Sequence, residues 1–534
     1  MNVNYLDYRQ TKCFSTTIIR YLDHDPQLRP FISHFPTLEG FSELLKTKRV
    51  VETNRELLVE VLKKQYTDLD LTNLTNTKVL SNIDSLLHPN TFTVTTGHQL
   101  NLFTGPLYLI FKLVTTINLA EALATQFPDK KFVPLYWMAT EDHDFEEINH
   151  TFIRREKIVW EHPAHGAVGR LQLNDIERVL QAYASLLGSS EHAQKLVKLV
   201  EQAYTQHSTL AEATRYLVHT LLGGYGLVIL DANQPELKRT FSPIVLQDIV
   251  QQNSFKCINR SSHQLENVGI DVQGHTREIN FFYLKDQLRE RLVLKNGLYQ
   301  VLHSNLVFDQ EQLQQEVQNH PERFSPNVMM RPLYQEHILP NIAYIGGGSE
   351  IAYWLQLKSN FEYYQLDFPI LVLRNSALII NQKQNAQLKK LGLRIIDLFD
   401  SIQTLQKKWV FSHTQHPLTL NQEWQELSII FEKIKTQASP IDVSLVSSTE
   451  AIKARLHQAL LRLEKKLLKA EKRNHREALS RIDRLKNELF PQGILQERTE
   501  NFGSFYARQG ESFIQSLVES FRPLDFQFTV LNEN

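Results

Sequence analysis

The segment 95–106 constrains the fold more than any other part of the chain, because it places a glycine-containing turn between a strand and a helix. Residues 91–95 predict a buried strand, and apolar residues at helical spacing begin near Gly105. In this turn His98 is a candidate catalytic residue, and the candidate binding residues are Thr96, Gly97, Gln99, Asn101 and Gly105. A free helix N-terminus carries unpaired N–H groups and partial positive charge, so this unit binds anions such as phosphates in open α/β sheets. We expect an enzyme that acts on a nucleotide or an acidic substrate.

Composition narrows the class of protein. A chain of 534 residues with 42% apolar and 22% charged residues is an ordinary globular protein of two or three domains. A net charge of −1 provides no general attraction to nucleic acid or to a membrane, so neither is expected as a partner. The chain has no apolar run of about 18 residues, no secretory signal pattern and only two cysteines. These features predict a cytoplasmic protein without a disulfide framework.

Short apolar runs alternate with helical stretches over the first 380 residues. The runs 132–139, 227–230 and 370–373 predict a mostly parallel sheet that is covered on both faces. The rhythm is broken between about 151 and 330, where helical stretches are mixed with the strand-like piece 278–283. We interpret this part as material inserted into the sheet domain.

The last third of the chain has a different pattern. Apolar residues recur at steps of three and four between 452 and 489, and no Gly or Pro occurs from 442 to 490. This pattern predicts one long helix with a coiled-coil seam. The expected domains are an α/β core over 1–384 with insertions at 151–330, a helical coiled-coil domain over 385–500, and a C-terminal segment, 501–534, that packs back on the core.

A cluster of polar residues follows the predicted strand 132–139. Asp142, His143 and Asp144 are candidate catalytic residues, because neighbouring carboxylates and imidazoles supply a base near neutral pH. The adjacent candidates for substrate or nucleotide binding are Trp137, Glu141 and Asn149. The same cluster could instead hold a divalent cation, or Glu146 and Glu147 could be the acidic start of a helix.

Two further segments follow predicted strands at the same edge of the sheet. Three glycines at 346–348 allow the backbone to approach a ligand closely, although a tight turn would also require glycine. The candidate binding residues here are Gly346, Gly347, Glu350 and Tyr353. Arg374, which directly follows the strand 370–373, would suit a phosphate or a carboxylate.

These blocks together resemble one family. The run 96–108, the run Glu141-Asp142-His143-Asp144-Phe145, the run 346–354 and the run 489–498 are similar, in this order, to the cysteine ligases (cysteine-adding enzymes) of bacillithiol biosynthesis. The resemblance implies a Rossmann-like core with connecting insertions, related to class I aminoacyl-tRNA synthetases. It also implies a coiled-coil domain that forms a homodimer, and the joining of cysteine to glucosaminyl-malate.

The implied chemistry requires an activated carboxylate, because amide formation from a free acid and an amine is uphill in water. ATP or another nucleotide, with or without Mg²⁺, is the expected source, and no tightly bound metal is expected. On this hypothesis Gly97 and His98 bind phosphate, and Asp142, His143 or Asp144 handles the amine.

One departure leaves the activation step open. The His-x-Gly-His turn and the Lys-Met-Ser-Lys-Ser loop of class I synthetases are absent, so an acyl-adenylate and an acyl-phosphate remain alternatives. The alternatives for the whole protein are a metal-dependent hydrolase that uses the 141–150 cluster and a nucleotide-binding coiled-coil scaffold. The coiled coil could pair between chains or fold back within one chain.

Overall fold

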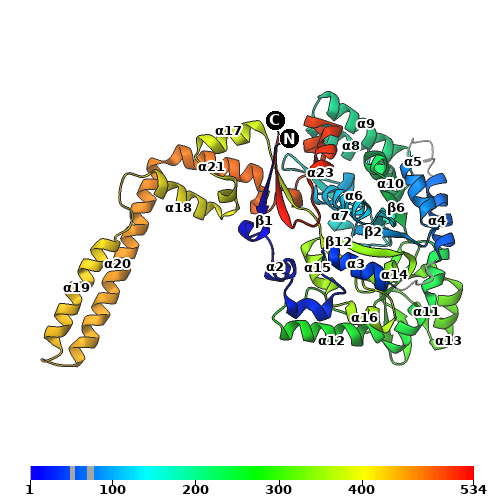
Figure 1. Cartoon of the computed structure of the whole chain (residues 1–534), viewed down its shortest axis with the longest axis horizontal. Helices are drawn as coiled ribbons and strands as arrows, with labels where there is room; N and C mark the ends of the chain where they lie inside the picture. The colour runs from blue at the N-terminus through cyan, green and yellow to red at the C-terminus, as the bar shows by residue number, and fades with distance from the viewer. Residues whose placement is uncertain (1, 49–53, 69–76, 534) are drawn as a thin grey trace. The chain divides into compact units, whose positions relative to one another are not determined.

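A five-stranded parallel sheet forms the centre of the larger of two units in the chain (Figure 1). The computed structural model describes residues 2–48, 54–68 and 77–533. The larger unit extends to Ile379 and also contains Leu495–Leu531, whereas the smaller unit contains Ile380–Ile494 and the end of the chain from Asn532. The predicted combination of a parallel-sheet α/β domain with a helical domain is confirmed.

The parallel sheet reverses its strand order at one point. The strands lie in the order β13-β12-β2-β3-β6, and each neighbouring pair is parallel. In that order their bounds are Ile370–Leu373, Asn341–Gly346, Thr91–His98, Lys131–Met138 and Val228–Asp231. The chain proceeds from β2 outward through β3 to β6, and then returns to the other side of β2 with β12. In open α/β sheets, ligands bind outside the carboxyl ends of the strands at such a switch point.

Helix α6 (Tyr108–Gln126) packs against β2 and β3. It accounts for the apolar residues that follow the turn at helical spacing. By length and composition it is the one described helix that could cross a membrane, but 67% of the relevant stretch is buried inside the protein. Its apolar residues therefore belong to the core. The helix begins close to its predicted start near Gly105, but β2 continues to His98 and the short helix η3 (Leu102–Thr104) precedes α6.

The insertion between β3 and β12 contains a second sheet. Its strands pair antiparallel in the order β10-β9-β8-β7-β11, with the bounds Val307–Phe308, Leu298–Val301, Leu288–Lys295, Phe281–Lys285 and Phe324–Pro326. A hairpin of β4 (His150–Ile153) and β5 (Glu156–Val159) precedes it. The helices of the insertion are α7 (Phe145–Ile148), α8 (Glu177–Leu187), α9 (Glu191–Thr205), α10 (Leu210–Leu222), α11 (Pro235–Gln251), α12 (Asn253–Asn267), α13 (Gln310–Asn319) and α14 (Arg331–Ile338).

The two ends of the chain also contribute to the larger unit. A three-stranded sheet has the order β1-β15-β14, with the bounds Asn2–Asp7, Gln527–Asn532 and Ala377–Ile380. The remaining helices of this unit are α1 (Tyr8–Thr11), α2 (Thr16–Leu22), α3 (Leu38–Thr47), α4 (Arg55–Thr67), α5 (Thr77–Ser85), α15 (Gly348–Trp354), α16 (Lys358–Tyr363), α22 (Gly503–Gln509) and α23 (Glu511–Ser520).

The smaller unit consists of helices. They are α17 (Gln382–Lys390), α18 (Ile402–His413), α19 (Asn421–Ala438), α20 (Ser444–Asn474) and α21 (Arg476–Leu489). The predicted single helix over 442–490 is wrong in one respect, because it is broken at His475. There the Asn474 side chain donates a hydrogen bond to Glu471, and the His475 ring lies edge-on against Trp409 of α18, at a ring-centroid distance of 5.4 Å. The break is confined to His475, whose φ of −98° and ψ of 19° are not helical, and α21 begins at the next residue.

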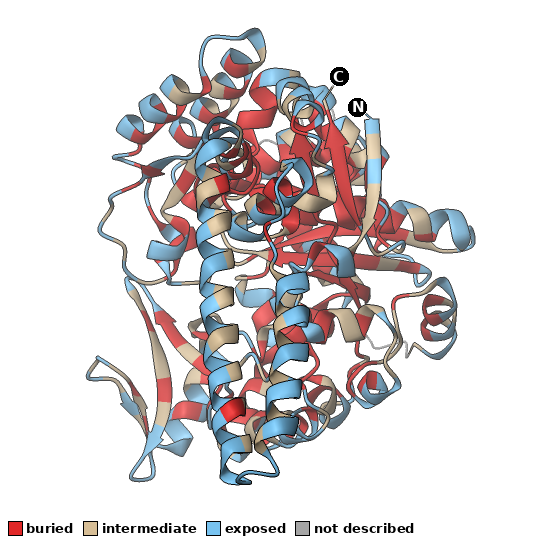
Figure 2. Ribbon diagram, turned by 90° about the vertical axis from the view of Figure 1, so that its left-hand side faces the viewer, coloured by how far each residue is buried: buried red, intermediate tan, exposed pale blue. Residues whose placement is uncertain are grey.

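Helices α19 and α20 form an antiparallel pair within the chain, joined by residues 439–443. The Trp424 and His457 rings stack at 4.2 Å between them, and Lys435 of α19 forms an ion pair with Glu450 of α20 at 2.6 Å. Figure 2 shows that both helices are mostly exposed or half-buried, and α19 has no buried residue.

Candidate active site

A cavity of about 770 Å³ lies at the carboxyl ends of the parallel strands. Residues after β2, β3 and β12 line it, as do residues of the antiparallel sheet and Arg498 of the C-terminal segment. All of these residues belong to the larger unit. The cavity therefore occupies the switch point of the sheet, where open α/β folds hold their ligands.

The end of β2 brings a neutral histidine to the cavity. Burial, with the nearby charge of Lys112, lowers the pKa of His98 to about 3. Its ring lies edge-on against Tyr108 at 5.3 Å, and its Nε2 atom is buried without a hydrogen-bond partner. An uncharged imidazole can exchange a hydrogen bond with a ligand but cannot neutralise a phosphate.

Glu350 is held in place at the other side of the switch point by a buried ion pair. It pairs with Lys112 of α6, accepts a hydrogen bond from Tyr344 at 2.7 Å and accepts another from the Gly347 N–H at 2.8 Å. Burial raises the pKa of Glu350, but the interaction with Lys112 outweighs it and lowers the pKa to about 2. Lys112 also donates to the Gly97 carbonyl at 2.9 Å, so this pair ties β2 to α15.

The segment after β3 forms an acidic group around Gln99. The Gln99 amide donates to Asp142 at 2.6 Å and to Glu147 at 2.9 Å. Burial raises the pKa of Asp142, but hydrogen bonds from His143 and Gln99 and the charge of Arg289 outweigh it and hold that pKa far below its usual range. Asp142 is therefore ionised and is a weak base.

The same segment fixes the proton of His143. Arg289 of β8 donates from Nη1 to Nδ1 of His143 at 2.7 Å. Because a guanidinium can only donate, Nδ1 accepts and the imidazole proton lies on Nε2. In this arrangement the Nε2–H group of His143 is a hydrogen-bond donor.

Two other charged candidates have partners within the protein. Glu141 forms an ion pair with the buried Lys238 of α11. Arg374 pairs with the fully buried Glu497 at 2.7 Å and donates to the Asn375 carbonyl and to Ser376. The position of Arg374 after β13 is as expected, but its charge is balanced by a carboxylate from the C-terminal segment.

The structure brings eleven of the predicted site residues together in this cavity, and they are Gly97, His98, Gln99, Trp137, Glu141, Asp142, His143, Gly347, Glu350, Tyr353 and Arg374. Six others do not line it, and they are Thr96, Asn101, Gly105, Asp144, Asn149 and Gly346.

Local structure explains each of these six corrections. The Thr96 hydroxyl donates to the Ile345 carbonyl within the sheet, and Asp144 caps α7 by accepting from the Glu147 N–H. Asn101 is buried against Gly105, whose φ of +59° shapes the turn before α6. The remaining two take part in backbone hydrogen bonds. The Gly346 carbonyl accepts from the Arg374 backbone N–H, and the Asn149 carbonyl accepts from the Trp160 backbone N–H.

Sequence reasoning missed several lining residues. They are Lys112, Arg289, Arg331 and Arg498. Two of them could have been found from the sequence. Lys112 is the single cation in an otherwise apolar helical stretch, and Arg498 lies in a run that carries the family resemblance. Arg289 and Arg331 follow no strand of the parallel sheet, so no pattern marked them.

The 141–150 cluster does not present a metal site. In the described part of the chain, no group of three or more His, Cys, Asp or Glu side chains is arranged to hold a metal ion. Glu141 and Asp142 are engaged instead by Lys238, Gln99 and Arg289. The hydrolase alternative therefore has no support from the arrangement of these side chains.

Comparisons with known proteins give consistent results over the whole chain. Residues 1–375 match the family described as "Bacillithiol biosynthesis BshC, N-terminal Rossmann-like domain", and residues 377–533 match its "C-terminal coiled-coil domain". A protein of Flavobacterium johnsoniae is 42% identical over 99% of this chain and 100% of its own length. Proteins of Flavobacterium psychrophilum and Christiangramia forsetii are 42% and 40% identical over 99% of both chains. Each of the three is named "Putative cysteine ligase BshC".

Proposed function

Because the chain belongs to the bacillithiol biosynthesis BshC family, we propose that it joins the carboxylate of cysteine to the amine of glucosaminyl-malate. The observation that carries this proposal is the cavity at the switch point, which has cationic and anionic groups on different lining segments. The reaction needs both, because it brings together a carboxylate, a nucleotide and an amine.

Activation of the cysteine carboxylate comes first in this proposal. A carboxylate oxygen attacks a phosphorus atom of ATP, with or without Mg²⁺, and releases pyrophosphate or ADP. The amine then attacks the activated carbonyl and releases AMP or phosphate. The His98 imidazole and the cationic side chains that line the cavity are hydrogen-bond donors for the negative charge that develops in these steps.

The acidic group around Gln99 is proposed to receive the amine substrate. Asp142 and Glu147 both accept hydrogen bonds from Gln99, and both line the cavity. Two carboxylates attract a substrate ammonium group, and one of them takes a proton from it before the free amine attacks. A second proton leaves the nitrogen as the amide forms.

The product assay tests the function directly. Purified protein is incubated with cysteine, glucosaminyl-malate, ATP and Mg²⁺, and mass spectrometry follows the thiol product and AMP or ADP. We expect product only when all three substrates are present. If no product forms with ATP or with any other nucleotide that replaces it, the proposal is contradicted.

Substitution of His98 tests the placement of the site. We expect His98→Ala to lower turnover by roughly 100-fold, because one preorganised hydrogen bond to developing charge is lost. His165→Ala, which alters an exposed histidine outside the cavity, is the matched control and should keep normal turnover. Normal turnover of His98→Ala would show that the chemistry occurs elsewhere.

The same proposal includes a cytoplasmic homodimer formed through the coiled-coil domain. The α19–α20 pair leaves large apolar side chains exposed, among them Ile429, Ile430 and Ile452. A second copy of this pair would cover them.

A further inference from the structure

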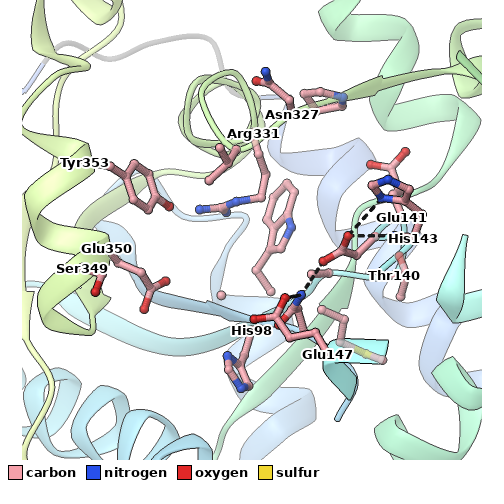
Figure 3. Close-up of a pocket in the computed structure, with 18 of the residues that line it drawn as sticks. His98, Thr140, Glu141, His143, Glu147, Asn327, Arg331, Ser349, Glu350 and Tyr353 are labelled. Atoms are coloured by element: carbon pink, nitrogen blue, oxygen red, sulfur yellow. Dashed lines mark hydrogen bonds and ion pairs between the residues drawn. The ribbon is translucent and has the colours of Figure 1, made fainter. Parts of the chain in front are cut away.

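Arg331 lies at the start of α14, with its guanidinium in the cavity (Figure 3). The guanidinium carbon is 5.8 Å from the centre of the Trp137 ring and 5.5 Å from that of Tyr344. Nη1 donates to Gln335 at 3.0 Å, and Nη2 is 3.4 Å from the Tyr344 hydroxyl. Two aromatic rings and two neutral acceptors thus hold the group in one orientation, and a guanidinium has further N–H donors to offer.

Arg331 makes no ion pair of its own among the described residues, although Tyr344, Tyr353 and the charge of Glu350 outweigh the effect of burial and raise its pKa. The other buried cations of the cavity have carboxylate partners, since Lys112 pairs with Glu350 and Arg374 pairs with Glu497. No carboxylate in the described ranges lies within 4.0 Å of Arg331. Arg331 therefore shares the charge of Glu350 with Lys112, and an incoming anion would give its guanidinium a direct partner.

The position on the helix adds to this positive potential. Arg331 is the first residue of α14, where the partial positive charge of the helix N-terminus adds to its own. The Gly97 backbone approaches it closely, because a Cβ at residue 97 would contact Nη1 at 3.4 Å, and both residues line the cavity. The local features therefore favour an anion between β2 and α14.

We propose that Arg331 binds the anionic group of a substrate, a carboxylate or a phosphate, at the switch point of the sheet. This inference rests on the proposed function for the choice of substrates. Both groups present paired oxygens that match the fork of a guanidinium. Within this chain Arg331, and not the internally paired Arg374, is the positioning group for that anion.

Binding measurements on single ligands test the inference without turnover. Calorimetric titrations of the full chain use ATP with Mg²⁺, L-cysteine and glucosaminyl-malate separately, with wild type, Arg331→Gln and Arg331→Lys. Arg178→Gln, which alters an exposed arginine of α8 outside the cavity, is the matched control. Thermal unfolding of each variant verifies that it is folded.

We expect Arg331→Gln to weaken one of these ligands by roughly 10- to 100-fold and to leave at least one other unchanged. Arg331→Lys should show an intermediate loss, because the charge is kept and the fork is not. Loss of ATP binding identifies a phosphate, whereas loss of cysteine or glucosaminyl-malate binding identifies a carboxylate.

The inference is overturned if wild type and folded Arg331→Gln bind all three ligands with equal affinity. It is also overturned if Arg178→Gln loses as much affinity as Arg331→Gln, or if wild type binds none of the anions. If Arg331→Gln does not fold, the comparison of wild type with Arg331→Lys decides, and unchanged affinities for all three ligands overturn the inference. Failure of the proposed ligase reaction is a separate result, since a wild-type protein that binds these anions but forms no product contradicts only the function.

Discussion

Glu336 of α14 is a buried carboxyl group that should make stability depend on pH. Burial raises its pKa from 4.5 to about 7, although Lys48 and Arg331 act in the opposite direction. Its Oε1 accepts from Gln335 and Asn341, while Oε2 has no partner. Between about pH 4.5 and pH 7 the folded chain retains a proton that the unfolded chain releases, so the stability of the wild type falls as the pH rises through this range.

Glu336→Gln should remove this dependence. We expect the variant to match wild type near pH 4.5 and to be more stable by about 3 kcal/mol at pH 8, because the shift of the pKa is then fully expressed. Chemical denaturation at several pH values measures the difference. The exposed Glu278→Gln should show no such trend, and a difference for Glu336→Gln that is constant with pH would contradict the account.

At this scale the sequence could place charged groups but not their partners. Arg374 and Glu350 follow strands, so their location at the carboxyl edge of the sheet was predictable. Their charges are balanced by Glu497 and Lys112, which are far away in sequence. Pairings of this kind depend on the tertiary fold, and for the same reason no pattern in the chain marked Arg331 as unpaired.

At the scale of elements, the turn between β2 and α6 depends on a distant asparagine. Phe103, Thr104 and Gly105 all have positive φ, and this conformation costs energy in the first two. Asn501 donates to the carbonyls of Phe103 and Gly105, both at 2.8 Å. The C-terminal segment thus holds the backbone that joins β2 to α6.

Asn501→Ala should therefore destabilise the larger unit. We expect a loss of about 2–4 kcal/mol, because two buried carbonyls lose their donor beside a strained turn. Denaturant unfolding measures this loss, and Asn319→Ala at an exposed position serves as the comparison. Equal stability of the two variants would show that the turn holds its shape without Asn501.

Local sequence patterns do not predict the exact ends of the strands or the strands that are short or exposed. The strand β2 was expected to end at Thr95 but continues to His98, because Gly97 and His98 pair with Trp137 and Met138 of β3. The antiparallel sheet of the insertion was predicted only in the piece 278–283, since its other strands are short or largely exposed. The apolar runs of the parallel sheet, by contrast, are buried on both faces and were recognisable.

At the scale of the whole molecule, the proposed homodimer can be tested on α19. Ile430 and Ile434 are 49% and 42% exposed, one turn apart on this helix. If a second chain covers them, Ile430→Glu with Ile434→Glu should convert a dimer to a monomer, because charges would be buried in an apolar contact. Light scattering after gel filtration measures the mass.

Gln425→Glu, which places one negative charge at another exposed position of α19, should remain dimeric. A wild-type protein that is monomeric at all concentrations would contradict the dimer. The sequence predicted a coiled-coil seam, and the structure shows that α19 and α20 satisfy part of it within one chain.

The return of Leu495–Leu531 to the larger unit has a consequence for biosynthesis. A ribosome makes Gly97 about 400 residues before Asn501, and it makes the whole helical unit between the two parts of the α/β unit. A nascent chain that has just completed Ile379 still lacks Glu497 and Asn501, so Arg374 has no counter-charge and the strained turn has no anchor. The cavity can therefore take its final form only after the segment Leu495–Leu531 has been made.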